Sequence, residues 1–145
     1  MLAALSLSLP AQTDVLTIEK VAKQTWKRGT TVAVPLSVKL QPGYHVNSNT
    51  PSEDYLIPFR VTWDAKPIEA GEAVFPKPKM ERYEFAEKPL SVFTGDFVIQ
   101  AGLRVPDNAP SGLGLAKAKV RFQACSHTYC LPPKTIEVQV PYEIR

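Results

Sequence analysis

Hydrophobic and polar residues alternate one by one along several stretches of the chain. The clearest stretch runs from Thr31 to Leu40, where every second residue is Val or Leu. The same period of two recurs at residues 57–63, 97–103, 116–124 and 136–144. Because successive side chains of a strand point to opposite faces, each stretch predicts a β-strand with one buried face. Residues 14–26 predict a further strand, although their pattern is mixed.

The segments between these stretches carry turn-forming residues, and no window shows the repeat of an amphipathic helix. Pro, Gly, Asn and Ser gather at residues 41–43, 47–52 and 106–112. The chain contains 14 prolines in 145 residues, about twice the usual share of ~5%, and proline interrupts helices. We therefore expect an all-β fold, an immunoglobulin-like antiparallel β-sandwich of about seven to nine strands.

The length of 145 residues corresponds to one domain, which we place at residues 13–145. Residues 1–12 are small and apolar without a basic start, and we interpret them as a signal-peptide remnant or a disordered leader. An exported domain would fold in a compartment that permits disulfides. The net charge of +3 is spread along the chain without a basic stripe, which argues against nucleic-acid binding.

Two cysteines, Cys125 and Cys130, lie between the last two predicted strands. Four residues separate them, which is the length of a hairpin loop. Residues that flank such a loop face each other with Cα atoms ~4.5–5.5 Å apart, and a disulfide needs ~4.4–6.8 Å. The spacing therefore permits both a dithiol and a disulfide.

Three roles are open for this pair: redox exchange, a structural disulfide or metal binding. A disulfide that closes a loop of about six residues stabilises a fold by only ~2 kcal/mol, against ~4.7 kcal/mol for a 100-residue loop. A bond that adds so little to stability, at the tip of a hairpin, favours exchange. Within the loop, a protonated or hydrogen-bonded His127 would lower the pKa of a neighbouring thiol. Pro132 and Pro133 stiffen the chain that leaves the loop.

The residues around the cysteines resemble those of a known family, the amino-terminal periplasmic domain of the DsbD-type thiol:disulfide interchange proteins. The most specific motifs are Phe122-Gln-Ala-Cys125 and Tyr129-Cys130-Leu-Pro-Pro133. Further matching motifs are Pro42-Gly-Tyr-His-Val-Asn47, Tyr55-Leu-Ile-Pro58 and Phe75-Pro-Lys-Pro. The resemblance covers most of the chain, although four residues separate the cysteines here and some members have five.

The resemblance implies an immunoglobulin-like sandwich in which Cys125 and Cys130 form a redox-active disulfide, with no cofactor and no metal. Such a domain accepts electrons from a thioredoxin-like domain, which is fed through a membrane core in the full-length protein. It passes them to oxidised periplasmic proteins such as disulfide isomerases and cytochrome c maturation proteins. We therefore expect a periplasmic component of a protein-disulfide reductase.

The resemblance also implies residues around the pair. In the family a phenylalanine on a cap loop covers the cysteines, and Phe85 of the stretch Tyr83-Glu84-Phe85 takes this place. The expected neighbours of the sulfurs are Tyr44, His45, Asn47, His127 and Tyr129.

Two functions of other classes stay open. A copper chaperone would hold Cu(I) through Cys125, Cys130 and His127, with His45 or Met80 as a further ligand, because soft thiolates favour that ion. A structural or adhesive sandwich would keep its disulfide closed, and a reduction potential below about −300 mV would indicate it.

Overall fold

The strands in residues 14–145 form three sheets of four strands each. The computed structural model describes residues 14–145, and all of the regular secondary structure in these residues is β-strand. The first sheet has the order β1 (Leu16–Ile18), β3 (Thr31–Leu40), β9 (Phe97–Arg104) and β6 (Glu69–Val74). The second sheet has the order β2 (Gln24–Trp26), β12 (Lys134–Ile144), β10 (Gly112–Phe122) and β5 (Arg60–Asp64). We call the third the end sheet; its order is β11 (Ala124–Cys125), β4 (His45–Asn47), β8 (Leu90–Thr94) and β7 (Lys79–Glu81).

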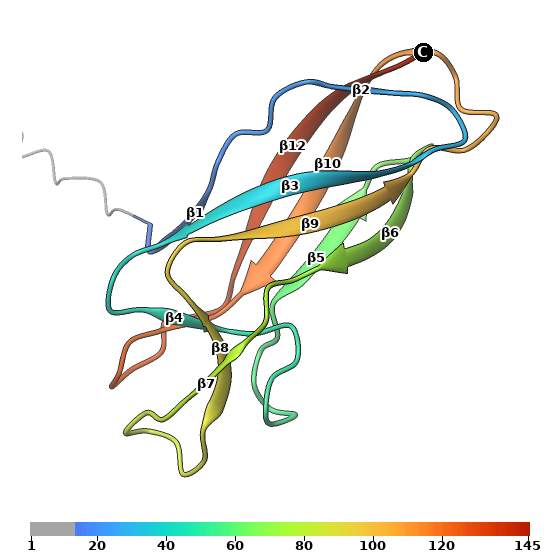
Figure 1. Ribbon diagram of the computed structural model, residues 1–145. Coiled ribbons are helices and arrows are strands. Elements are labelled where there is room, and N and C mark those ends of the chain that lie inside the picture. The colour runs from blue at the N-terminus through green and yellow to red at the C-terminus, as the bar shows by residue number, and fades with distance from the viewer. Residues whose placement is uncertain (1–13) are drawn as a thin grey trace, which may run out of the picture.

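The first and second sheets lie face to face and enclose the main hydrophobic core. Figure 1 shows β3 and β9 of the first sheet lying over β10 and β12 of the second. Alternate residues of β3 point inward, so Val34 and Leu36 have no exposed surface and belong to the same core as Val120 of β10. The predicted all-β immunoglobulin-like sandwich is confirmed. Within residues 14–145 no helix is long and apolar enough to cross a membrane.

A cluster of aromatic rings fills one end of this core. Phe59 has no exposed surface and lies at the centre of the cluster. Four other rings surround it with centroids 5.8–6.2 Å away, those of Phe75, Phe93, Phe97 and Phe122. Because these rings come from both sandwich sheets, the end sheet and a connecting segment, they fix the end sheet to the sandwich.

The structure differs from the prediction in the number of strands and in one pairing. The described residues contain twelve strands, and β2 runs parallel to β12. The strands β4, β7 and β8 are only three to five residues long, and β4 and β8 are buried on nearly all positions, so alternation does not reveal them. The pattern of residues 14–26 is mixed because this segment contains two short strands of different sheets. β1 pairs with β3 in the first sheet, and β2 pairs with β12 in the second.

The end sheet is built from extensions of the sandwich strands. β3 continues into β4 through a turn at Pro42 and Gly43, whose φ of 86° suits glycine. β8 continues into β9 through Gly95, with φ of 67°, and β10 is interrupted only at Gln123 before β11. In Figure 1 the end sheet therefore lies at one end of the sandwich, with the hairpin after β11 beside β4. The predicted leader at residues 1–12 lies outside the described residues.

Candidate active site around the cysteine pair

Cys125 and Cys130 form a disulfide at the tip of the hairpin between β11 and β12. Their Cα atoms are 3.9 Å apart, closer than the predicted distance. Two backbone hydrogen bonds flank the pair, from Ser126 N–H to the Tyr129 carbonyl (2.7 Å) and from Leu131 N–H to the Ala124 carbonyl (2.9 Å). The cysteines are therefore a non-hydrogen-bonded pair of an antiparallel ladder, in which the side chains share one face.

Residues next to the cysteines make further hydrogen bonds within the hairpin, which do not involve the sulfur atoms. Gln123 interrupts the strand, and its Nε2 donates a hydrogen bond to the Leu131 carbonyl (3.1 Å) across the hairpin. Ser126 Oγ accepts hydrogen bonds from the backbone N–H groups of Thr128 (3.2 Å) and Tyr129 (3.1 Å), which closes the loop. Gln123 of the Phe122-Gln-Ala-Cys125 motif therefore has a structural role in the hairpin.

Four residues form one row across the end sheet, and we call them the cysteine rung: Cys130, Cys125, His45 and Thr94. Cys130 is bridged to Cys125, which pairs with His45 of β4, and His45 pairs with Thr94 of β8. Residues paired in this way point to the same face of a sheet. The neighbouring row, Ala124, Val46 and Phe93, points to the other face and joins the main core.

Two aromatic rings cover His45 on this face. The ring of Tyr83 is stacked on the imidazole with centroids 3.8 Å apart, and Phe85 lies beside this pair, 5.6 Å from Tyr83 and 6.1 Å from His45. Tyr83 is 6% exposed, whereas Phe85 is 42% exposed. Both residues belong to the loop between β7 and β8, which we call the cap loop (residues 82–89). Phe85 is therefore not a core residue, and its role as the cap stays a prediction.

His45 is an unusual buried residue. It is 2% exposed, and its Nε2 is the one buried side-chain nitrogen or oxygen among residues 14–145 that lacks a hydrogen-bond partner. Burial lowers the pKa of His45 to about 4, with the carboxylate of Glu81 opposing the shift and His127 adding to it. The imidazole is therefore neutral at pH 7.

Tyr83 and Glu81 are site residues that the sequence analysis did not select. The phenol of Tyr83 donates a hydrogen bond to Glu81 Oε2 (2.8 Å), and burial, followed by this bond, raises the pKa of Tyr83. A cavity of about 260 Å³ opens beside them, lined in part by Tyr44, His45, Glu81, Tyr83, Thr94 and His127. The sequence signal that could have found Tyr83 is its position two residues before Phe85, as the other aromatic residue of the same stretch.

Of the other predicted neighbours, Tyr44, Tyr129 and His127 have their contacts with other residues of the site, and Asn47 has its contact outside it. Tyr44 and Tyr129 lie together, with their hydroxyl oxygens 2.8 Å apart, and this hydrogen bond raises the pKa of Tyr44. His127 is exposed in the loop, with its ring 5.5 Å from that of Tyr83. The amide of Asn47 instead donates to the Ile57 carbonyl (3.0 Å), so it fixes a neighbouring segment. The roles of all these residues toward the sulfurs stay predictions.

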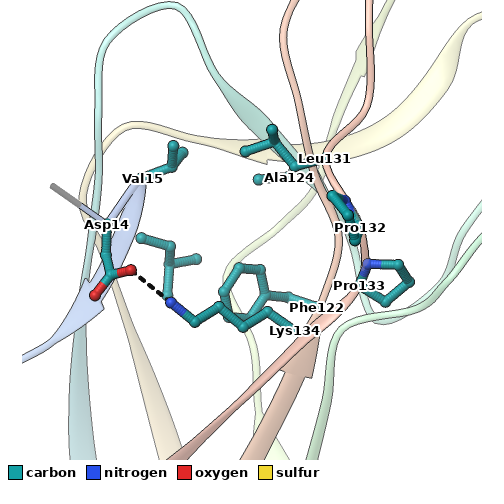
Figure 2. A pocket seen from close by; sticks show the side chains of 9 residues that line it. Asp14, Val15, Phe122, Ala124, Leu131, Pro132, Pro133 and Lys134 are labelled. Carbon is teal, nitrogen blue, oxygen red and sulfur yellow. Dashed lines mark hydrogen bonds and ion pairs between the residues drawn. The ribbon is translucent and has the colours of Figure 1, made fainter. Parts of the chain in front are cut away.

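A second cavity, of about 320 Å³, lies beside the chain that leaves Cys130. Figure 2 shows its apolar lining and the ion pair between Asp14 and Lys134 at its rim. The lining side chains shown there include Val15, Phe122, Ala124, Leu131, Pro132 and Pro133. The two prolines thus form part of a wall.

No group of three or more His, Cys, Asp or Glu side chains in residues 14–145 is placed to hold a metal ion. The copper-chaperone alternative stays a prediction, and copper titration of the reduced protein tests it.

The fold is shared with the solved structure of another protein. The reduced N-terminal domain of Neisseria meningitidis DsbD is similar with a TM-score of 0.52 at 15% sequence identity, over 80% of this chain and 82% of that chain. A type I cohesin–dockerin complex from Clostridium thermocellum contains a chain with a TM-score of 0.49 at 13% identity, over 91% of this chain and 100% of that chain. No curated protein matches this chain in sequence.

The family comparison is more specific. Residues 12–141 match the family described as thiol:disulfide interchange protein DsbD, N-terminal. This match spans most of the chain and includes the cysteine hairpin and the cap loop. The chain therefore belongs to the family of DsbD N-terminal domains, in which a cysteine pair at disulfide distance fits thiol–disulfide interchange.

Proposed function

We propose that this domain relays electrons from a thioredoxin-like donor to oxidised extracytoplasmic proteins through Cys125 and Cys130. The observation that carries the proposal is the unequal exposure of the two cysteines at the tip of the hairpin. Cys125 is 3% exposed and Cys130 is an exposed residue. Thiol–disulfide exchange needs one sulfur that a partner's thiolate can reach. Membership of an interchange family supports the same reaction.

The reaction proceeds in two exchanges. A thiolate of the donor attacks Cys130 Sγ, which forms a mixed disulfide and releases Cys125 as a thiol after it takes up a proton. The donor's second thiolate attacks the donor sulfur of this mixed disulfide and releases Cys130. Two electrons and two protons have then moved to the domain, and the donor has become a disulfide.

The second exchange passes the electrons on. The Cys130 thiolate attacks a disulfide of the acceptor, and Cys125 resolves the new mixed disulfide by attacking Cys130 Sγ. The domain returns to its oxidised form and the acceptor leaves as a dithiol. The exposed cysteine makes each contact with a partner, and the buried cysteine closes the cycle within the chain.

The cap loop gives this site a shield. Tyr83 and Phe85 cover the imidazole next to Cys125, so small oxidants and stray thiols meet aromatic rings on that side. We place Phe85 as the part that a partner displaces, because it is the more exposed ring. We further place the domain in the periplasm, where it is either one domain of a longer protein with a membrane core that feeds its donor, or a stand-alone relay with a separate donor.

Single-cysteine variants test this proposal. The partner is a thioredoxin-like protein with one active-site cysteine, activated as its mixed disulfide with thionitrobenzoate. We expect the reduced Cys125→Ser variant, which keeps Cys130, to release thionitrobenzoate about tenfold faster or more than Cys130→Ser. Mass spectrometry then identifies the mixed disulfide.

A small reagent provides the control. Both unfolded variants should react equally with dithionitrobenzoate, which shows that any difference comes from the fold. If neither folded variant forms a mixed disulfide with the thioredoxin-like protein, the relay is refuted.

A further inference from the structure

We propose that His45 is a positioning residue for the cysteine pair: its Nε2 accepts a hydrogen bond from the Cys125 thiol when the disulfide is reduced. This inference rests on the proposed function only for its biological use, because chemical reduction of the disulfide is enough to test it. The imidazole of His45 is not a reactant in the exchange steps described above.

The first argument is geometric. His45 and Cys125 are directly paired across β4 and β11 and so project from the same face of the end sheet. Tyr83 is stacked on the imidazole with centroids 3.8 Å apart, and the backbone of His45 is held between β11 and β8, where it pairs with Cys125 and Thr94. Its position beside Cys125 is therefore set by the fold.

The second argument concerns hydrogen bonding. A buried polar nitrogen without a partner costs free energy, and His45 Nε2 is such an atom in the disulfide form. A disulfide sulfur has no proton to offer, but a thiol is a donor, although a weak one. Reduction therefore creates a donor in the row that holds the unpartnered nitrogen.

The third argument concerns charge. The groups that face the imidazole are Glu81 of β7, Tyr83 of the cap loop and His127 of the cysteine loop. Burial outweighs the attraction of Glu81 for a proton, so the ring stays neutral at pH 7 and keeps one nitrogen free as an acceptor. A neutral partner suits a thiol in a buried position better than a thiolate.

The consequence is a shift of the redox equilibrium toward the dithiol. We expect His45→Phe, which keeps a ring to stack on Tyr83 and removes both nitrogens, to lower the equilibrium constant for reduction by dithiothreitol. The expected change is about threefold to tenfold, or about 14–30 mV for a two-electron couple. His45→Gln places an amide near the same position and should restore part of the loss.

A matched control separates this effect from general destabilisation. Ser91→Ala removes another buried polar group of the end sheet, one whose Oγ lies 2.7 Å from that of Ser48. It should destabilise both redox states equally and leave the equilibrium constant within about twofold of wild type. A shift in Ser91→Ala as large as that in His45→Phe overturns the inference, and so does an unchanged constant in His45→Phe.

Nitrogen NMR of the wild-type protein gives a readout that needs no variant. We expect the Nε2 resonance of His45 to report an unprotonated nitrogen in both states and to move on reduction as it accepts the hydrogen bond. A proton on Nε2 in the reduced state would refute the proposal. These measurements use only dithiothreitol as the reductant. If the thioredoxin-like partner fails to exchange, the proposed relay is refuted, but the test of the role of His45 is unaffected.

Discussion

Reduction of the Cys125–Cys130 disulfide should lower the free energy of unfolding by about 2 kcal/mol at most. The bond joins residues five apart, so it closes a loop of about six residues, and the chain-entropy relation gives ~2.2 kcal/mol for a loop of that size at 25 °C. For a domain of this length the change corresponds to a fall in Tm of only about 5–8 °C.

The folded hairpin supports a value at the low end. Four interactions that do not involve sulfur hold the hairpin closed: the two backbone bonds beside the pair, the side-chain bond of Gln123 and the turn around Ser126. The hairpin is also paired to β4 through β11. Because none of these contacts involves sulfur, we expect the reduced domain to keep them and to keep its fold.

Urea unfolding of the oxidised and dithiothreitol-reduced protein, followed by tryptophan fluorescence, measures this difference. The m-value should stay the same, because both states expose nearly the same surface on unfolding. The variant with both cysteines replaced by serine should match the reduced form. A loss above about 4 kcal/mol, or a reduced protein that is unfolded in water, would refute the reasoning and identify the disulfide as a structural staple.

Three further predictions follow from the core and the end sheet. Phe59→Ala should lower the free energy of unfolding by about 3–5 kcal/mol, because it empties the centre of a five-ring cluster, and calorimetry that shows less than ~1 kcal/mol would contradict the packing. Ser91→Ala should lower the free energy of unfolding in urea by about 1 kcal/mol in both redox states, because Ser48 Oγ loses its hydrogen bond to Ser91 and keeps only those to Thr50. The third prediction concerns pH: His45 has a pKa of about 4 when folded and ~6.5 when unfolded, so between these values the unfolded chain binds a proton that the folded chain does not. Stability should therefore fall as the pH drops from about 6.5 to 4, by up to about 3 kcal/mol, and His45→Phe should lack this component.

The sandwich was predictable because its strands carry a simple rule. The prediction of Thr31–Leu40 matches β3 at both ends, and residues 97–103 and 136–144 lie within β9 and β12. In these strands one face meets the core and the other meets solvent, so burial and sequence share a period of two. Where both faces are buried, as in β8, or where the strand has three residues, no period can be read.

Of the candidate site, the sequence pattern predicted only the part formed by residues close together in the chain. The spacing of Cys125 and Cys130 indicated a hairpin, and a disulfide closes it. The row that adds His45 depends on which strand lies next to β11, and neither composition nor alternation specifies that neighbour. The stacking of Tyr83 on His45 depends in turn on the path of the cap loop, which carries no periodic pattern. Tertiary contacts between distant segments therefore supplied what the sequence pattern lacked.

The cap loop packs on a small hydrophobic cluster of its own. Tyr83 belongs with Leu90 and Val92 to a small hydrophobic cluster, supported by Leu56 and Ala86, that is separate from the main core. Opening this cluster exposes a few side chains and leaves the aromatic centre of the sandwich buried. Local opening then costs much less than global unfolding. The cap displacement that we propose would therefore leave the paired strands of Cys125 and His45 in register.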